Sequence, residues 1–134
     1  MALEWTSKIA VGVDLIDDQH KELFDRTNRL LETCKNGGSQ EEVISSLSFL
    51  QDYVSQHLRD EESLQEKHNY PDMDSHKEQH KVFLEKVALI KADIDARGAT
   101  LVNVIKTTNL FVTWLSKHIS QEDKKLGEFL TGKV

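Results

Sequence analysis

Apolar side chains recur at steps of three and four residues through most of this chain, which is the period of an amphipathic helix. Three breaks interrupt the period: NGGS at 36–39, NYPD at 69–72, and Gly98. Glycine ends helices readily, and proline cannot continue one. The pattern therefore predicts four long helices and a short final one, at about 17–36, 40–67, 74–97, 100–120 and 122–131.

The first sixteen residues lack this period and predict an irregular arm, with Trp5 and Val11 as its anchors on the helices. Strand patterns are absent from the rest of the chain. Amphipathic helices joined by short connections pack side by side in alternating directions. The expected fold is all-α: one domain over 1–134, an up-down-up-down four-helix bundle with an arm at 1–16 and a short C-terminal helix.

The composition argues against some classes of binding partner. The formal net charge of −6 argues against nucleic acid, which needs a basic stripe, and against an anionic membrane surface. No apolar run is long enough to span a bilayer, and MALEWTSKIA lacks the pattern of a signal peptide. Cys34 is the only cysteine, which we interpret as a small buried hydrophobe in a reducing compartment. A cytoplasmic protein is expected.

Five of the six histidines and one glutamate fall on the apolar stripes of the predicted helices, so they face the interior. Counting residues from the turns near Gly38 and Gly98 places four of these histidines about 27–30 Å from one end of the bundle. The other two side chains lie one helical turn further on. The set is His20, His57, Glu61, His76, His80 and His118.

A single histidine on an apolar face is usually a hydrogen-bonded core residue. Five of them at one height beside Glu61 leave many polar atoms to satisfy, and an unpaired buried carboxylate is costly. Imidazole and carboxylate are metal ligands, so the cluster predicts a metal site; on chemistry alone zinc and manganese suit it as well as iron. His68, about 10 Å beyond Glu61 along the axis, is interpreted as a helix-end residue.

Asp123 follows His118 by five residues, which on an unbroken helix places the two side chains about 140° apart. Both can serve one site only if the helix ends or changes course within 119–122. Local rules instead favour a solvated acid, or an N-cap for the final short helix. From the residues alone, the role of Asp123 stays open.

The order of VGVDLIDDQHKELF, HLRDEESL, NYPDMDSHKEQHKVFL and WLSKHISQED resembles the hemerythrin family, in particular its single-domain bacteriohemerythrins. The similarity runs from Trp5 to about Leu130. It implies a non-haem di-iron centre, in which Glu61 and Asp123 bridge both irons together with a hydroxide or oxo group. The implied terminal ligands are His76, His80 and His118 on one iron, and His20 and His57 on the other.

This donor count leaves one position open on the iron with two histidines, where the resemblance implies reversible binding of dioxygen. Storage, delivery or scavenging is expected rather than catalysis, because oxidative di-iron bundles use Glu-x-x-His pairs and this sequence has none. Alternatives are sensing of oxygen or redox state through a separate partner, and a di-iron enzyme acting on peroxide or nitric oxide. A protein that receives the oxygen is a further expected partner.

Apolar side chains within one turn of the ligands are expected to keep the oxygen pocket dry. They are Leu23, Phe24, Trp114, Leu115 and Ile119. Gln65, four residues after Glu61, faces the same interior, where the family commonly carries an apolar residue, often methionine. Its amide can bond dioxygen, hold a water or turn away at the helix end.

We hypothesise that Gln65 speeds oxidation to the inactive ferric form by bringing a polar group to the pocket. The variant Gln65→Met should then autoxidise more slowly than the parent protein. The decay of the oxygenated absorption band in air measures this rate. Equal rates in the two proteins would reject the hypothesis.

Overall fold

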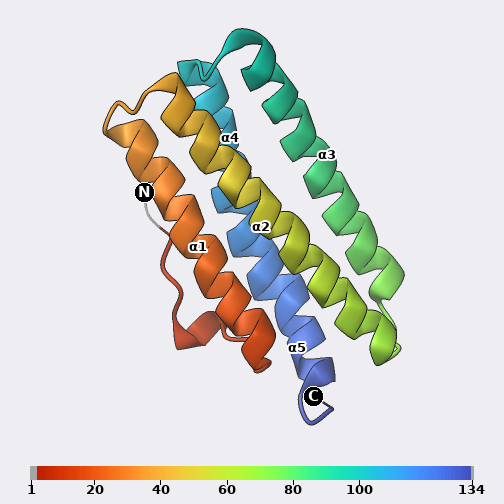
Figure 1. The fold of residues 1–134 in the computed structure, drawn as a ribbon. Helices are drawn as coiled ribbons and strands as arrows, with labels where there is room; N and C mark the ends of the chain where they lie inside the picture. Colours follow the sequence, from red (N-terminus) through yellow and green to blue (C-terminus); the bar gives the residue numbers. More distant parts are fainter. Residues whose placement is uncertain (1–2, 134) are drawn as a thin grey trace.

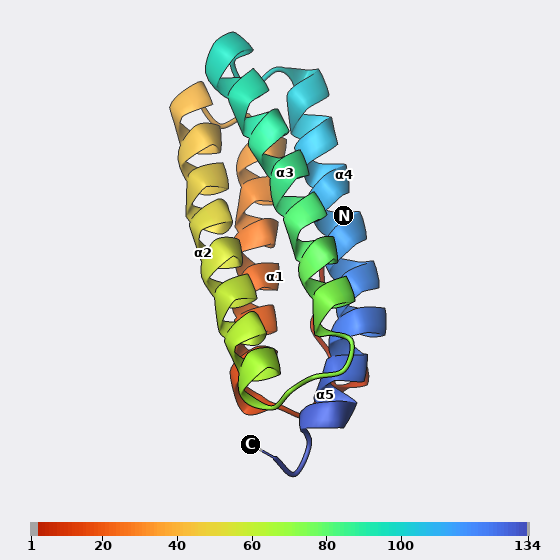
Figure 2. The same cartoon turned by 90° about the vertical axis from the view of Figure 1, so that its right-hand side faces the viewer.

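The computed structural model describes residues 3–133, so residues 1 and 2 of the expected arm and residue 134 lie outside the described residues. Four long helices run side by side in alternating directions, which confirms the predicted all-α bundle (Figures 1 and 2). A π-helical turn (Ile119–Asp123) joins α4 to the short α5. The helices are α1 (Asp14–Lys35), α2 (Gln40–Lys67), α3 (Met73–Arg97), α4 (Leu101–His118) and α5 (Lys124–Leu130).

Side-chain caps fix where two of the long helices begin. The Ser39 hydroxyl accepts a hydrogen bond from the backbone N–H of Glu42, and the Glu42 carboxylate accepts one from the backbone N–H of Ser39. Thr100 caps α4 in the same manner through the N–H of Asn103. Caps of this kind satisfy N–H groups that have no partner within the helix, so the ends of both connections are specified locally.

The arm is shorter than the apolar period predicts, because α1 already begins at Asp14. The Asp17 carboxylate accepts hydrogen bonds from the N–H groups of Val11 and Gly12, at 2.8 and 3.2 Å. An acidic side chain in the first turn also suits the helix dipole. These contacts begin the helix earlier than predicted, and the buried Ile16 extends the apolar stripe into its first turn.

Both predicted anchors of the arm contact the bundle. Val11 is buried, and Trp5 is half-buried against the main core with the Lys21 ammonium 4.4 Å from its ring. Asn28 of α1 holds the N-terminal part of the arm. Its side chain accepts a hydrogen bond from the N–H of Leu3 and donates one to the carbonyl of Leu3. The arm therefore lies along the α1 side of the bundle (Figure 1).

Two apolar clusters form the core. The larger is contributed by all four long helices and includes Leu50, Phe83 and Phe111. The smaller lies where the arm, the α2–α3 connection and α5 meet, around Ile16 and Tyr70. Cys34 is only half-buried, against the larger cluster, and burial raises the pKa of its thiol.

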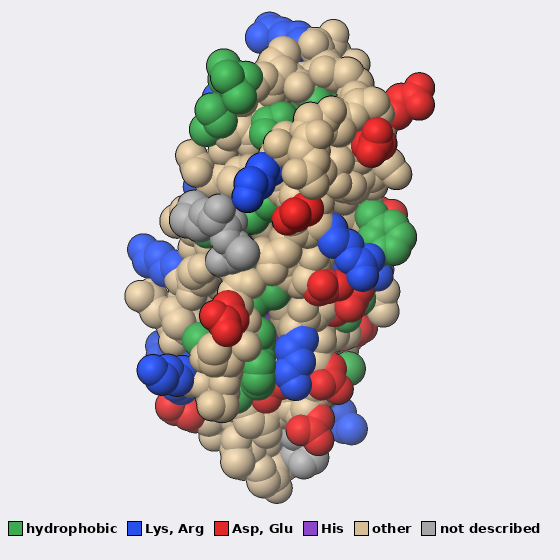
Figure 3. Space-filling model, turned by 90° about the vertical axis from the view of Figure 1, so that its left-hand side faces the viewer, with side chains coloured by type: hydrophobic (Ala, Val, Ile, Leu, Met, Phe, Trp, Pro, Cys, Tyr) green, Lys and Arg blue, Asp and Glu red, His purple; other side chains and the backbone are tan. Residues whose placement is uncertain are grey.

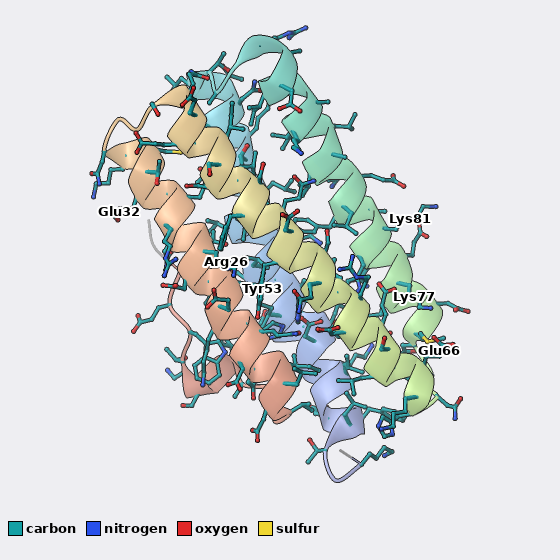
Figure 4. All side chains as sticks on the ribbon, in the orientation of Figure 1. Arg26, Glu32, Tyr53, Glu66, Lys77 and Lys81 are labelled. Carbon is teal, nitrogen blue, oxygen red and sulfur yellow. The ribbon has the colours of Figure 1, made fainter. Side chains whose placement is uncertain are left out.

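The surface carries both signs of charge. Acidic and basic side chains are interspersed over the face shown in Figure 3. Arg26 of α1 lies over the rings of Phe49 and Tyr53 of α2, while Lys77 and Lys81 project away from α3 (Figure 4). Within residues 3–133, none of the helices is both long and apolar enough to cross a membrane.

Gly127 gives a test of how α5 docks on the arm. A Cβ at this position would lie 2.1 Å from the Val11 carbonyl oxygen, a contact that only glycine avoids. We expect Gly127→Ala to lower the free energy of unfolding by about 1–3 kcal/mol, as overpacking does. Urea denaturation measures the change.

The exposed Glu128, next along the same helix, supplies the control. Glu128→Ala should alter the free energy of unfolding by less than about 0.5 kcal/mol. Equal stabilities of the Gly127→Ala variant and the parent would contradict the close approach of α5 to the arm.

Candidate metal centre

Seven polar side chains meet in the interior, and none is more than 4% exposed. Helices α1, α2, α3 and α4 and the π-helical turn each supply at least one of them. The structure thus brings the six predicted interior residues and Asp123 to one place. They are His20, His57, Glu61, His76, His80, His118 and Asp123.

The seven side chains form two groups that share their carboxylates. Within each group, the ligand atoms lie within 4.8 Å of one another. The three-histidine group contains His76, His80 and His118, and the two-histidine group contains His20 and His57. Glu61 and Asp123 belong to both groups, so the arrangement provides two neighbouring metal positions with common carboxylates.

Each carboxylate turns one oxygen to each group. Asp123 Oδ1 lies 2.9 Å from His76 Nε2 and 3.0 Å from His118 Nε2, and Asp123 Oδ2 lies 2.9 Å from His20 Nε2. Glu61 Oε1 lies 3.1 Å from His76 Nε2, and Glu61 Oε2 lies 3.3 Å from His57 Nε2. This is the disposition that two bridging carboxylates need.

The donor atoms fit a pair of metal ions better than they fit one another. Neither Glu61 oxygen has a partner in hydrogen-bonding geometry among the described residues, although imidazole nitrogens lie close by. His76 Nε2 and His118 Nε2 are 2.9 Å apart. Neighbouring ligands on a six-coordinate ion with bonds of roughly 2.1 Å are about 3 Å apart. The nitrogens and oxygens are therefore placed as ligands around common centres.

Four of the five imidazoles have a partner at the nitrogen that faces away from the carboxylates. His57 Nδ1 lies 2.6 Å from Gln19 Oε1, and Gln19 in turn donates to Asp60. Metal-binding histidines generally donate their second N–H in this way, which fixes the ring. The other three pairs are His76 with Gln65, His80 with Glu62, and His118 with Gln79.

The π-helical turn is what brings Asp123 to the cluster. A π turn closes on the fifth residue, so a side chain five positions later returns to nearly the same face. The predicted change of course after His118 is confirmed, since residues Ile119–Asp123 take this form. Asp123 is 1% exposed, so the alternative of a solvated acid is wrong; it occupies the N-cap position of α5, as the other alternative expected, but its side chain makes no capping hydrogen bond there.

Both carboxylates stay charged in spite of their burial. Burial and the charge of Asp123 act to raise the pKa of Glu61, but the close imidazoles of His57, His76 and His80 outweigh them and lower it. Burial likewise acts to raise the pKa of Asp123, and the histidines around it hold that pKa well below its ordinary value. Two buried negative charges make the pocket a site for cations.

The residues expected around an oxygen pocket fall into two sets. Leu23, Phe24, Leu115 and Ile119 are buried in the main core, and Phe24 and Ile119 also line a cavity of about 170 Å³ together with Ser116 and with Leu3, Glu4 and Ile9 of the arm. The other two expected pocket residues contact the three-histidine group. Trp114 stacks on His118, with ring centroids 4.1 Å apart, and Gln65 contacts His76.

Sequence reasoning missed the partners of the imidazoles. Gln19 and Gln79 directly precede ligand histidines, and Glu62 directly follows Glu61, but adjacency does not identify which ring each one meets. Gln19, for example, contacts His57 rather than its neighbour His20. His68 forms the C-cap of α2 and belongs to neither donor group, as its interpretation as a helix-end residue required.

The fold and the cluster together define a class: a four-helix bundle that can hold two neighbouring metal ions on histidines and shared carboxylates. The family model for the hemerythrin HHE cation binding domain matches residues 11–130. The chain belongs to the hemerythrin family. Proteins of this family hold a pair of iron ions, and the donor set here fits that cofactor.

Individual relatives agree with this placement. A bacteriohemerythrin of Methylococcus capsulatus is 34% identical, with 96% of this chain and 97% of the relative covered. A bacteriohemerythrin of Stenotrophomonas maltophilia is 31% identical, over 91% of this chain and 77% of the relative. A crystal structure of wild-type hemerythrin superposes with a TM-score of 0.89 at 32% identity, covering 98% of this chain and all of that one.

The cluster predicts how the metal-free protein responds to pH. Burial acts to lower the pKa of His76, but the oxygens of Asp123 and Glu61 outweigh it and raise the pKa from 6.5 to about 9. Because the folded state holds this proton more tightly, its stabilising effect is complete below pH 6.5 and is lost as the pH rises through about 9. The free energy of unfolding should fall across this range in urea titrations.

Burial acts to lower the pKa of His57, but the nearby Glu61 carboxylate outweighs it and raises that pKa, so His57 adds to the same trend. The variant His76→Gln should show a shallower loss of stability over this range, because the contribution of His76 is gone. A parent protein whose metal-free stability stays constant or increases from pH 6.5 to pH 9 would contradict the electrostatics described above.

Proposed function

We propose that this protein binds dioxygen reversibly at a di-iron centre, for oxygen storage, delivery or scavenging. One observation carries the proposal: two buried donor groups share Glu61 and Asp123 but differ in their number of histidines. The position with two histidines has fewer protein donors, so an exchangeable ligand has room there. Membership of the hemerythrin family supports iron as the metal.

The ligand assignment follows from the two groups. Glu61 and Asp123 would be shared by the two irons, and a hydroxide or oxo group would join them there, because each carboxylate has one oxygen beside each histidine group. The terminal ligands are His76, His80 and His118 on one iron, and His20 and His57 on the other.

A pair of ferrous ions, when bound, supplies the two electrons that dioxygen takes up on binding and returns on release. The side chains of this protein protect that exchange. Phe24, Leu115 and Ile119 are nearly inaccessible to solvent and lie within about one helical turn of His20 or His118 in the sequence, so we expect them to keep water away from the cluster. A reducing compartment such as the cytoplasm suits both a ferrous centre and the single Cys34.

The donor set favours binding over oxidation of a substrate. Five neutral imidazoles and two carboxylates supply less negative charge than the glutamate-rich sites of oxidative di-iron bundles. High-valent iron is therefore less well stabilised here. On the three-histidine side, five side chains already converge on one position, which leaves little room for a second exchangeable ligand.

Repeated gas exchange tests the proposal directly. The iron-loaded ferrous protein should form a visible absorption band under dioxygen and lose it under argon, over many cycles, with two irons per chain by metal analysis. Asp123→Asn removes the charge of one bridge and should abolish the repeatable band. Glu122→Gln, a change at the adjacent half-buried position, should leave it intact.

Other outcomes would replace the proposal. Oxidation that occurs once, with turnover of added peroxide or nitric oxide, would identify an enzyme. A reversible band accompanied by oxygen-dependent binding of a separate protein would identify sensing, or delivery to a recipient, according to whether that protein takes up the oxygen.

A further inference from the structure

Gln65 is a fully buried amide in the last two turns of α2, in contact with a histidine of α3. Its amide nitrogen lies 2.9 Å from His76 Nδ1, and its carbonyl oxygen has no hydrogen-bond partner among the described residues. Rotation of the amide by 180° exchanges its nitrogen and oxygen, so either atom can face the ring. The chemistry of His76 decides which of them does so.

The opposite nitrogen of His76 points into the cluster. Nε2 lies 2.9 Å from Asp123 Oδ1 and 3.1 Å from Glu61 Oε1, within the three-histidine group. A ring nitrogen that binds a metal carries no proton, so the proton of the neutral imidazole sits on Nδ1. Nδ1–H then needs an acceptor. The Gln65 carbonyl oxygen is the group that can reach it.

We propose that Gln65 is a positioning residue for His76, whose Nδ1–H it accepts so that Nε2 stays aimed at the three-histidine metal position. This inference rests on the metal centre of the proposed function. It also explains why an amide is buried here, since an amide buried without such a task is costly. His76 lies in the first turn of α3, close to the α2–α3 connection, so the hydrogen bond ties two helices where the ligand is least supported by the helix itself.

Gln65 is more deeply buried than two of the other side chains that contact the ligand histidines. Gln79 and Glu62 are partly exposed, so water can replace them at His118 and His80. Gln65 is closed to solvent, and its loss leaves Nδ1–H of His76 without an acceptor. Gln19 is buried as well, but it holds His57 of the two-histidine group. The two buried glutamines therefore serve different metal positions.

Cobalt(II) titration of the metal-free protein tests this assignment. We expect two binding steps in the optical spectrum, and downfield exchangeable proton resonances from the Nδ1–H groups of the ligand histidines. Gln65→Met, which keeps the side-chain size, should weaken one step by about 10–100-fold, the usual effect of losing such a partner. The same variant should lose the resonance that is absent in His76→Gln.

Matched variants separate positioning from folding. Gln19→Met should weaken the other step, and Gln79→Met should have a smaller effect than Gln65→Met because water takes over. Gln65→Glu keeps an acceptor, and so it should retain the affinity and slow the exchange of the His76 proton. The melting temperature of each metal-free variant shows whether the fold itself has changed.

Three results would overturn the inference: unchanged cobalt affinity with a retained His76 resonance in Gln65→Met, a Gln65→Glu variant that binds as weakly as Gln65→Met, or exchange in Gln65→Glu that is no slower than in the parent. The rate of proton exchange in Gln65→Glu still tests the inference if Gln65→Met does not fold. A parent that binds no cobalt would overturn both this inference and the proposed function. Cobalt binding with these effects, but no reversible dioxygen band with iron, would remove the proposed function alone.

Discussion

Two carboxylates buried within a few ångströms of each other are the constraint on which the rest of this bundle depends. Glu61 and Asp123 each carry a negative charge that water cannot screen, and both stay ionised because imidazoles surround them. Such a cluster persists in a core only if cations or protons balance it. Each of the four long helices therefore has to present at least one histidine at the same height, and the connections set that height.

After α4, the backbone departs from regular α-helical geometry in a way that meets this constraint. A regular helix would turn Asp123 away from His118, yet the chain adopts a π-helical turn and places Asp123 Oδ1 3.0 Å from His118 Nε2. π-helical turns are rare and are often found at functional sites. The short α5 follows this turn and packs against the arm, where Gly127 lets it approach Val11. The feature that completes the cluster thus also closes the end of the bundle.

The periodic part of this structure was accessible from the sequence because burial imposes it. Each ligand histidine lies on the apolar stripe of its own helix, and the distances from Gly38 and Gly98 set the common level. The spacing of His118 and Asp123 required a change of helical course only if both serve one site, and the structure shows that change. Contacts between helices were not accessible in this way. Which ring Gln19 meets, or that Gln65 and Trp114 contact the three-histidine group, depends on side-chain rotamers and helix rotation, which a period of 3.6 residues does not encode. The early start of α1 was missed because hydrogen bonds from the arm to Asp17, which an apolar period does not encode, help to begin that helix.

The two sides of the cluster differ in how firmly their ligands are held, and this difference has a physical origin in the second nitrogen of each imidazole. All three rings of the three-histidine group have a partner there, supplied by Gln65, Glu62 and Gln79. On the other side, Gln19 holds His57, whereas Nδ1 of the fully buried His20 has no hydrogen-bond partner among the described residues. Phe24, one helical turn after His20 on α1, lines a small cavity together with residues of the arm. If the proposed function holds, this asymmetry lets the three-histidine position keep its ligands in place while the two-histidine position, which has fewer protein donors, exchanges a small neutral ligand.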